Sequence, residues 1–149
     1  MLNKAVKEML LRYECRSLHD HEQALREILQ EVALVGLWRG KFFEHAAFYG
    51  ETALRIFYNL DRFSEDLDFT LLSRSSEWNW AQYGEAVVHE LRSFGFEASF
   101  LEKEKSSQTE IKSAFLKVPT VQELLKIGVH SDFLRGVHPE SMIRIKVSD

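Results

Sequence analysis

Apolar positions along this chain recur in two patterns: every three or four residues, as in helices, and every second residue, as in strands. The helical spacing covers residues 1–36, 51–58, 78–94 and 120–128. Strand-like runs cover residues 46–49, 66–72, 96–101, 111–118 and 142–147. Strands interleaved with helices predict an α/β (α+β) domain, in which a small twisted mixed sheet carries packed helices and an N-terminal helical extension.

Breaking and capping residues set the expected ends of three helices. The segment at 36–40 has a glycine at each end and predicts a break after the first helical region. Gly95 predicts the end of the helix before it. Thr120 followed by Glu123 is a capping-box pattern, which predicts a helix beginning with Thr120 as its cap.

Length and composition are ordinary for one globular domain. The chain has 149 residues, of which 45% are hydrophobic and 28% charged, and this length is enough to bury a core. We predict a single domain, with residues 1–40 as a helical extension and 41–149 as the core. The net charge of −4 gives no overall positive field for nucleic acid.

Cysteine, histidine and hydropathy exclude several classes of site. Cys15 is the only cysteine, so no internal disulfide can form. No apolar run is long enough to span a membrane and no signal peptide is visible, so we expect a cytoplasmic protein with no membrane partner. His19 and His21 are two residues apart, whereas a metal-binding pair on a helix favours a spacing of four. We therefore expect them to be surface residues.

Two aspartates lie inside an apolar run. Asp66 and Asp68 are separated by Leu67 and followed by Phe69. In a strand both carboxylates point to the same face, about 7 Å apart, while Leu67 and Phe69 point into a core. Neighbouring carboxylates repel each other, and a divalent cation held by oxygen ligands is the usual compensation. The pair therefore predicts a metal site.

A glycine opens the helical stretch that precedes this pair. The first backbone N–H groups of a helix are unpaired and favour an anion, and Gly50 lets the backbone approach that anion closely. Thr52, two residues on, is a candidate phosphate contact. An anion site followed by a cation site suits a nucleoside triphosphate with bound Mg²⁺.

These segments carry a resemblance to a known family. The sequences YGETALR at 49–55 and RFSEDLDF at 62–69 resemble the nucleotidyltransferase superfamily, and more narrowly its AbiEii/AbiGii toxin branch. That branch supplies bacterial type IV toxin–antitoxin systems and phage abortive infection. The match is specific over about twenty residues, because helix start, aspartates and spacing occur together.

The resemblance implies a nucleotidyltransferase-like fold and a metal-dependent enzyme. It would move a nucleotidyl group from an NTP to an RNA or protein hydroxyl, with Mg²⁺ or Mn²⁺ as cofactor and an antitoxin protein as a further partner. The implied catalytic and metal-binding residues are Asp66 and Asp68. The implied nucleotide-binding residues are Gly50, Thr52, Arg62 and Lys146.

The chain departs from the family pattern at two places. In the family, a later strand carries a third carboxylate, but here Ser148 occupies the expected position and Asp149 comes one residue late. A shift of one residue turns a side chain to the opposite strand face. Glu51 stands where the family has a second glycine or a serine, which brings negative charge to the anion site; Arg55 or Arg62 could neutralise it.

These departures leave alternatives open. The chain resembles the N-terminal catalytic half of a longer family member, or a shortened descendant. It could be a degenerate module that acts by NTP binding or protein interaction, or its site could need a partner chain or a C-terminal region. Asp66 and Asp68 could also be solvent-facing residues of an edge strand. Arg62 could pair with Glu65 instead of a phosphate, and Lys146 could line a solvated strand face.

Overall fold

The computed structural model describes residues 3–73, 78–103 and 111–148. Within these ranges the helices are α1 (Lys4–Leu10), α2 (Leu18–Arg39), α3 (Gly50–Tyr58), α4 (Ala81–Ser93) and α5 (Thr120–Lys126). The strands are β1 (Ala46–Tyr49), β2 (Leu67–Leu71), β3 (Ser99–Glu102), β4 (Ile111–Val118) and β5 (Ser141–Ser148). Two short 3-10 turns, η1 (Phe42–Glu44) and η2 (Ser131–Phe133), complete the described elements.

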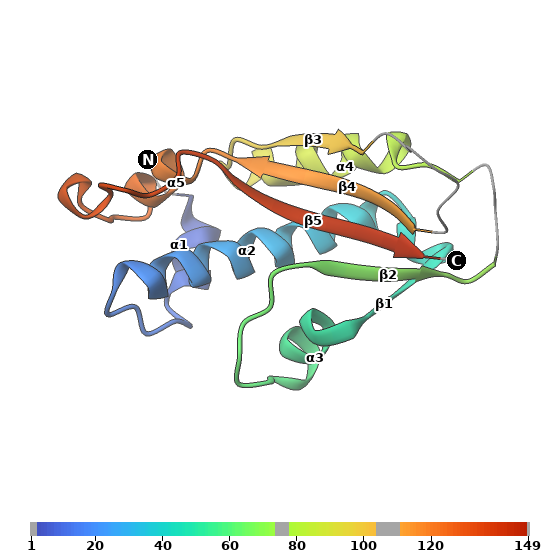
Figure 1. Ribbon diagram of the computed structural model, residues 1–149, viewed down its shortest axis with the longest axis horizontal. Coiled ribbons are helices and arrows are strands. Elements are labelled where there is room, and N and C mark those ends of the chain that lie inside the picture. The colour runs from blue at the N-terminus through green and yellow to red at the C-terminus, as the bar shows by residue number, and fades with distance from the viewer. Residues whose placement is uncertain (1–2, 74–77, 104–110, 149) are drawn as a thin grey trace.

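The five strands form one mixed sheet in the order β1-β2-β5-β4-β3 (Figure 1). Strands β2 and β5 pair in parallel, and the other neighbouring pairs are antiparallel. Strand β2 is therefore flanked on both sides, by β1 and by β5. This excludes the alternative that the two aspartates belong to an edge strand, and it confirms the expected mixed α/β architecture.

Alternation along β2 and β5 decides which side chains enter the core. Leu67 and Phe69 of β2 and Ile143, Ile145 and Val147 of β5 are almost completely buried. Their face of the sheet is covered by α2 and α4, which lie behind the strands in Figure 1. Because strand side chains alternate, the intervening residues of both strands must point to the opposite face, called here the open face.

Helix α2 continues through the glycine that was expected to break it. It ends at Arg39, with Gly36 inside it. An added Cβ at Gly36 would lie 2.9 Å from Val87 Cα in α4. The helix does end within the segment 36–40, with Gly40 as its C-cap. Gly36 lies inside the helix because it serves the close approach of two helices, a tertiary contact that outweighs its low helix propensity.

The predicted capping box at α5 was wrong. The N-cap of α5 is Pro119, with no side-chain hydrogen bond. The Thr120 hydroxyl is hydrogen-bonded to Ser141 at the start of β5. The Glu123 carboxylate instead accepts hydrogen bonds from the backbone N–H of Glu97 at 3.1 Å and from Lys126 Nζ at 3.2 Å. Both side chains tie α5 to other elements.

Other expectations hold in part. Gly95 follows α4 with φ of +86°, as expected for a helix-ending glycine. The strand expected at 96–101 is shorter and shifted, since β3 covers only Ser99–Glu102. Within the described ranges, no helix has both the length and the apolar character needed to cross a bilayer.

Candidate functional site

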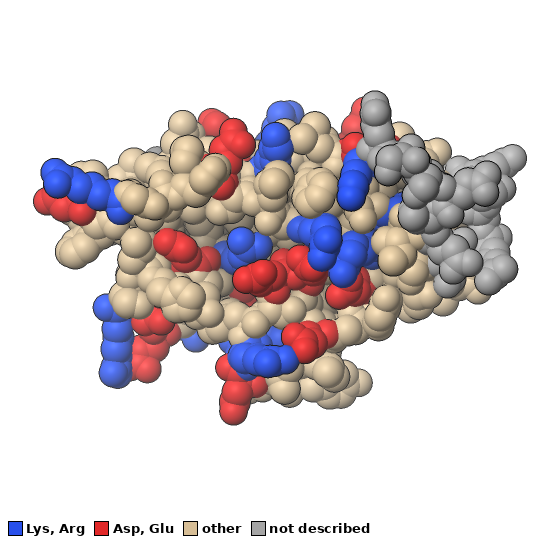
Figure 2. Space-filling model, in the orientation of Figure 1, with Lys and Arg blue, Asp and Glu red and all other residues tan. Residues whose placement is uncertain are grey.

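The two aspartates lie at the start of β2, on the open face of the sheet. Asp66 immediately precedes the strand, and Asp68 is its second residue. Because Leu67 and Phe69 are buried on the other side, the alternation of the strand directs both aspartates to the open face. In Figure 2 acidic and basic side chains gather together over the middle of this face.

Two cations from β5 lie against the aspartates. Lys146 Nζ is 3.1 Å from Asp68 Oδ1 and 3.6 Å from Asp66 Oδ2. Arg144 Nη2 donates to Asp66 Oδ2 at 3.1 Å. A single ammonium reaches both carboxylates, so the two side chains are directed to a common point. The local charges balance, with two carboxylates against one guanidinium and one ammonium.

The parallel pairing of β2 with β5 creates this arrangement. In the strand register, Asp68 is the Cα partner of Lys146. Arg144, two residues earlier in β5, occupies the same face one step closer to Asp66. The sequence analysis named Lys146 but missed Arg144. The alternation of Arg144, Lys146 and Ser148 along one face was the available signal, and only the strand order showed what it faces.

Gly50 brings the start of α3 against Asp68. Its φ is +88°, in the left-handed region that side chains rarely adopt. A Cβ at this position would lie 3.1 Å from Asp68 Oδ2. The backbone conformation favours glycine here, and any side chain would also crowd the nearby carboxylate. The unpaired amides of the first turn of α3 therefore begin beside the acidic pair.

We expect Gly50→Ala to destabilise the protein by about 1–3 kcal/mol, because alanine is strained at positive φ and crowds Asp68. Gly128→Ala is the matched control, since Gly128 has φ of +98° with no atom near its would-be Cβ. Urea unfolding should show the larger loss for Gly50→Ala. Equal losses would mean that the contact with Asp68 adds nothing to the backbone strain.

Thr52 lies inside the protein, beneath the segment that leads to Asp66. Its side chain is 1% exposed. The hydroxyl donates to the backbone carbonyl oxygen of Asp66 and lies 2.6 Å from the hydroxyl of Ser64. These bonds fasten α3 to the entrance of β2. The phosphate contact expected for Thr52 stays a prediction, and its observed bonds position Asp66.

Gln30 of α2 holds the same segment from the other side. It is 1% exposed, and its Nε2 donates to the carbonyl oxygens of Ser64 at 2.9 Å and Glu65 at 3.1 Å. A buried amide that satisfies two carbonyls stabilises one backbone conformation. The sequence analysis did not identify Gln30, because its partners lie in a segment more than thirty residues away.

Arg62 neutralises the unexpected glutamate. Its Nη2 lies 2.6 Å from Glu51 Oε1, and both side chains are well exposed, at 72% and 61%. Arg55 and Arg62 were both considered as partners of Glu51, and in the structure the partner is Arg62. Arg55 is engaged elsewhere, and Arg62 pairs with Glu51 and not with Glu65. Nucleotide binding by Arg62 stays a prediction.

Arg55 belongs to a largely buried cluster that ties the segment between α1 and α2 to α2 and α3. Its Nε donates to Glu27 Oε2 at 2.8 Å, and its Nη1 donates to the Leu60 carbonyl at 2.7 Å. Tyr13 donates its hydroxyl to Glu27 Oε1 at 2.8 Å. The Arg55 guanidinium also lies over the Phe63 ring, 4.2 Å from its centroid. The cluster fixes the loop between α3 and β2 on both sides.

Burial and the Glu27 carboxylate together raise the pKa of Tyr13 above its ordinary range. A raised pKa favours the neutral phenol in the folded protein, so this stabilisation is present below about pH 10 and is lost as the pH rises further. We expect the free energy of unfolding to fall more steeply above this pH in the natural chain than in Tyr13→Phe. Alkaline urea titrations test this, with exposed Tyr58→Phe as the control, which should behave like the natural chain.

The later strand supplies no acidic side chain within the described residues. Ser148 is the Cα partner of Thr70, and its hydroxyl lies 3.5 Å from the Phe69 carbonyl oxygen. Asp149, the acidic residue one position after the one expected for the third carboxylate, lies outside the described residues. In the described ranges, no group of three or more histidine, cysteine, aspartate or glutamate side chains is placed to hold a metal.

Two carboxylates directed to one point nevertheless fit Mg²⁺. This ion is commonly bound by one or two carboxylates together with waters and substrate phosphates, and not by a full protein cage. The oxygen chemistry of Asp66 and Asp68, and the neighbouring helix start at Gly50, suit such a shared site.

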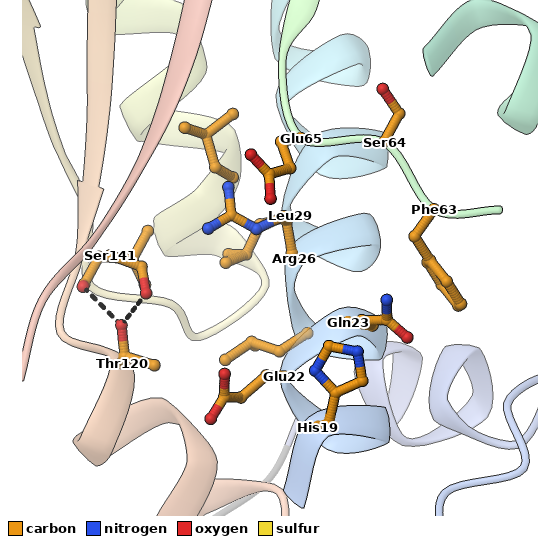
Figure 3. A pocket seen from close by; sticks show the side chains of 13 residues that line it. His19, Glu22, Gln23, Arg26, Leu29, Phe63, Ser64, Glu65, Thr120 and Ser141 are labelled. Carbon is orange, nitrogen blue, oxygen red and sulfur yellow. Dashed lines mark hydrogen bonds between the residues drawn. The ribbon is translucent and has the colours of Figure 1, made fainter. Parts of the chain in front are cut away.

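A separate pocket of about 200 Å³ adjoins the loop before Asp66 (Figure 3). It lies between the first half of α2, residues 63–65 and the ends of β4 and β5. Arg26 lines it, and its Nη1 donates to the Met142 carbonyl at 3.4 Å. Neither aspartate of the candidate site lines this pocket.

Comparison with known proteins gives the class to which this fold and site belong. The sequence model described as "Nucleotidyl transferase AbiEii toxin, Type IV TA system" matches residues 32–148, most of the chain. The protein therefore belongs to the AbiEii family of nucleotidyltransferase toxins. Tyr13, Glu27 and Gln30 lie before the matched region. Their hydrogen bonds nevertheless help to hold residues of the family motif in place.

Two solved structures from Helicobacter pylori are similar at 18% identity. One is described as a proposed nucleotidyltransferase, with a TM-score of 0.43, and covers 83% of this chain. The other is JHP933, with a TM-score of 0.44 and 85% coverage. This chain spans 43% of each of those chains. No curated protein matches.

Proposed function

We propose that this chain transfers a nucleotidyl group from an NTP to a hydroxyl of RNA or protein, with Mg²⁺ or Mn²⁺ bound at Asp66 and Asp68. The observation that carries the proposal is their geometry. Both carboxylates converge on the Lys146 ammonium, and the positive-φ Gly50 places the start of α3 directly beside Asp68. Family membership supports the same chemistry.

Each residue has a definite role in this proposal. Asp66 and Asp68 would hold the metal, which would supply charge neutralisation at the phosphates and favour ionisation of the attacking hydroxyl. Gly50 leaves room for phosphate oxygens at the α3 amides. Thr52 and Gln30 keep the segment before β2 in place through buried hydrogen bonds. Lys146 binds a phosphate oxygen once the carboxylates have another cation.

A label-transfer experiment tests the proposal. The protein is incubated with Mg²⁺ and each NTP in turn, labelled either at the α- or at the γ-phosphate, with total RNA and cytosolic protein as acceptors. Nucleotidyl transfer predicts labelled acceptor only from the α-labelled nucleotide. Label that arrives only from the γ-position would indicate phosphoryl transfer and contradict the proposal.

A second candidate is a degenerate module that keeps the fold without transfer. It is favoured by Ser148 at the expected carboxylate position and by the complete charge pairing of Asp66 and Asp68 within the protein. Absence of acceptor labelling together with retained NTP binding in calorimetry would support this candidate over the enzyme.

The family description as a type IV toxin supports one further part of the proposal, an antitoxin that counters this chain. We expect that expression of the chain in a bacterial host inhibits growth. Inhibition that persists after replacement of both site aspartates would separate toxicity from nucleotidyl transfer.

A further inference from the structure

Lys146 differs from the other described cations on the open face, because its one ammonium contacts both aspartates. The distances are 3.1 Å to Asp68 Oδ1 and 3.6 Å to Asp66 Oδ2. Arg144 contacts Asp66 alone. In the described part of the chain, Lys146 is the cation paired with Asp68, whereas Asp66 keeps Arg144 as a second partner.

The position of the ammonium is the position that a metal shared by the two carboxylates would require. Mg²⁺ binds carboxylate oxygens at about 2.0–2.1 Å, so the metal and the ammonium would need the same oxygens. Two cations at such a separation repel each other strongly. The Lys146 ammonium would therefore compete with a metal held by both aspartates.

The lysine side chain is suited to leaving this position. An ammonium is a compact point charge on a flexible four-carbon stem, without the fixed fork of a guanidinium. The Lys146 side chain is 30% exposed and projects from the last half of β5 over the open face. If it swings off Asp68, a triphosphate bound at the start of α3 would offer it a compensating negative charge.

We propose that Lys146 is an internal counter-cation that excludes metal from the nucleotide-free site and transfers to a nucleotide phosphate when the metal binds. The proposal rests on the proposed function, because it assigns a role to Lys146 within that site. It makes metal and nucleotide binding mutually dependent. By linkage, nucleotide must raise metal affinity by the same factor as metal raises nucleotide affinity.

The test uses Mn²⁺, whose free concentration is followed by electron paramagnetic resonance, with and without a non-hydrolysable NTP analogue. In the absence of nucleotide, Lys146→Met should bind Mn²⁺ about fivefold to tenfold more tightly than the natural chain, because the competing cation is gone. With the analogue present this advantage should disappear. The factor by which analogue strengthens Mn²⁺ binding should be smaller in the variant.

Two controls keep the result specific. Lys117→Met removes a lysine from the same face in β4, and should leave Mn²⁺ affinity unchanged. Arg144→Met removes the cation that donates to Asp66 Oδ2 and leaves Asp68 paired with Lys146, so it should strengthen nucleotide-free Mn²⁺ binding less than Lys146→Met does. Urea unfolding of each variant establishes that it is folded before its affinity is compared.

Equal or weaker Mn²⁺ binding by nucleotide-free Lys146→Met would overturn the counter-cation role. If the natural chain still binds the Mn²⁺–analogue pair in that case, the proposed function survives and only the role of Lys146 fails. If neither protein binds Mn²⁺ with the analogue present, metal dependence fails, and the counter-cation proposal is overturned with it.

Discussion

Asp68→Asn should lower nucleotidyl transfer about a thousandfold, equivalent to ~4 kcal/mol of transition-state stabilisation, while the protein remains folded. Asparagine has nearly the same shape but lacks the charge that attracts a divalent cation. The carboxylate is 23% exposed and its ion pair is with Lys146. We expect a stability change of about 1 kcal/mol or less, because a partly exposed ion pair contributes little to folding.

The measurement is the initial rate of α-label transfer at saturating Mg²⁺ and NTP. Asp132→Asn is the matched control, because Asp132 is exposed and pairs only with His130 among the described residues, at 3.4 Å. It should retain full activity. If Asp68→Asn retains more than a tenth of the natural rate, Asp68 does not hold the metal used in transfer.

The orientation of the two aspartates could be predicted from sequence because it depends on local alternation. Once Leu67 and Phe69 are assigned to the core, Asp66 and Asp68 must share the other face. Gly50 was named because it lets the backbone approach an anion, which stays a prediction, and its φ of +88° was not part of that expectation. The orientation of the aspartates needs only neighbouring residues.

The surroundings of the aspartates could not be predicted, because they come from distant segments. The Asp66–Arg144 pair joins residues 78 positions apart, and it follows from the parallel pairing of β2 with β5. No local pattern specifies that strand order. Gly36 was misjudged for a related reason, since only the packing of α4 against it explains a glycine inside α2.

Buried polar residues were the largest omission. Glu27 and Gln30 lie on α2 among apolar residues, and the spacing alone marks this face as core. Their partners, Arg55 and the carbonyl groups of residues 64 and 65, are contributed by segments that follow much later. A buried polar side chain is tolerated only with such partners. Its presence therefore indicates a hydrogen bond or ion pair to another element, but does not identify the partner.

Glu27→Ala should destabilise the protein by about 3–5 kcal/mol, because it removes one partner from a largely buried ion pair. The side chains of Arg55 and Glu27 are only 16% and 8% exposed. The substitution leaves a buried guanidinium without its carboxylate, and it removes the acceptor of the Tyr13 hydroxyl. Urea unfolding followed by circular dichroism measures the loss.

Glu31→Ala provides the matched control on the same helix. Glu31 pairs with Arg12 at 2.6 Å, but the Arg12 side chain is 53% exposed, so the expected cost is about 1 kcal/mol or less. The double variant Glu27→Leu, Arg55→Met should recover much of the stability, since it removes both charges and restores apolar volume.

The same variants separate the stability of the fold from the order of the site. Arg55 binds the Leu60 carbonyl and lies over Phe63, so it fixes the loop that leads to Asp66. The double variant removes both buried charges, which restores stability, but it also removes these two contacts of Arg55. We therefore expect near-natural unfolding with weakened Mn²⁺–nucleotide binding, and natural affinity in that variant would contradict a positioning role for this cluster.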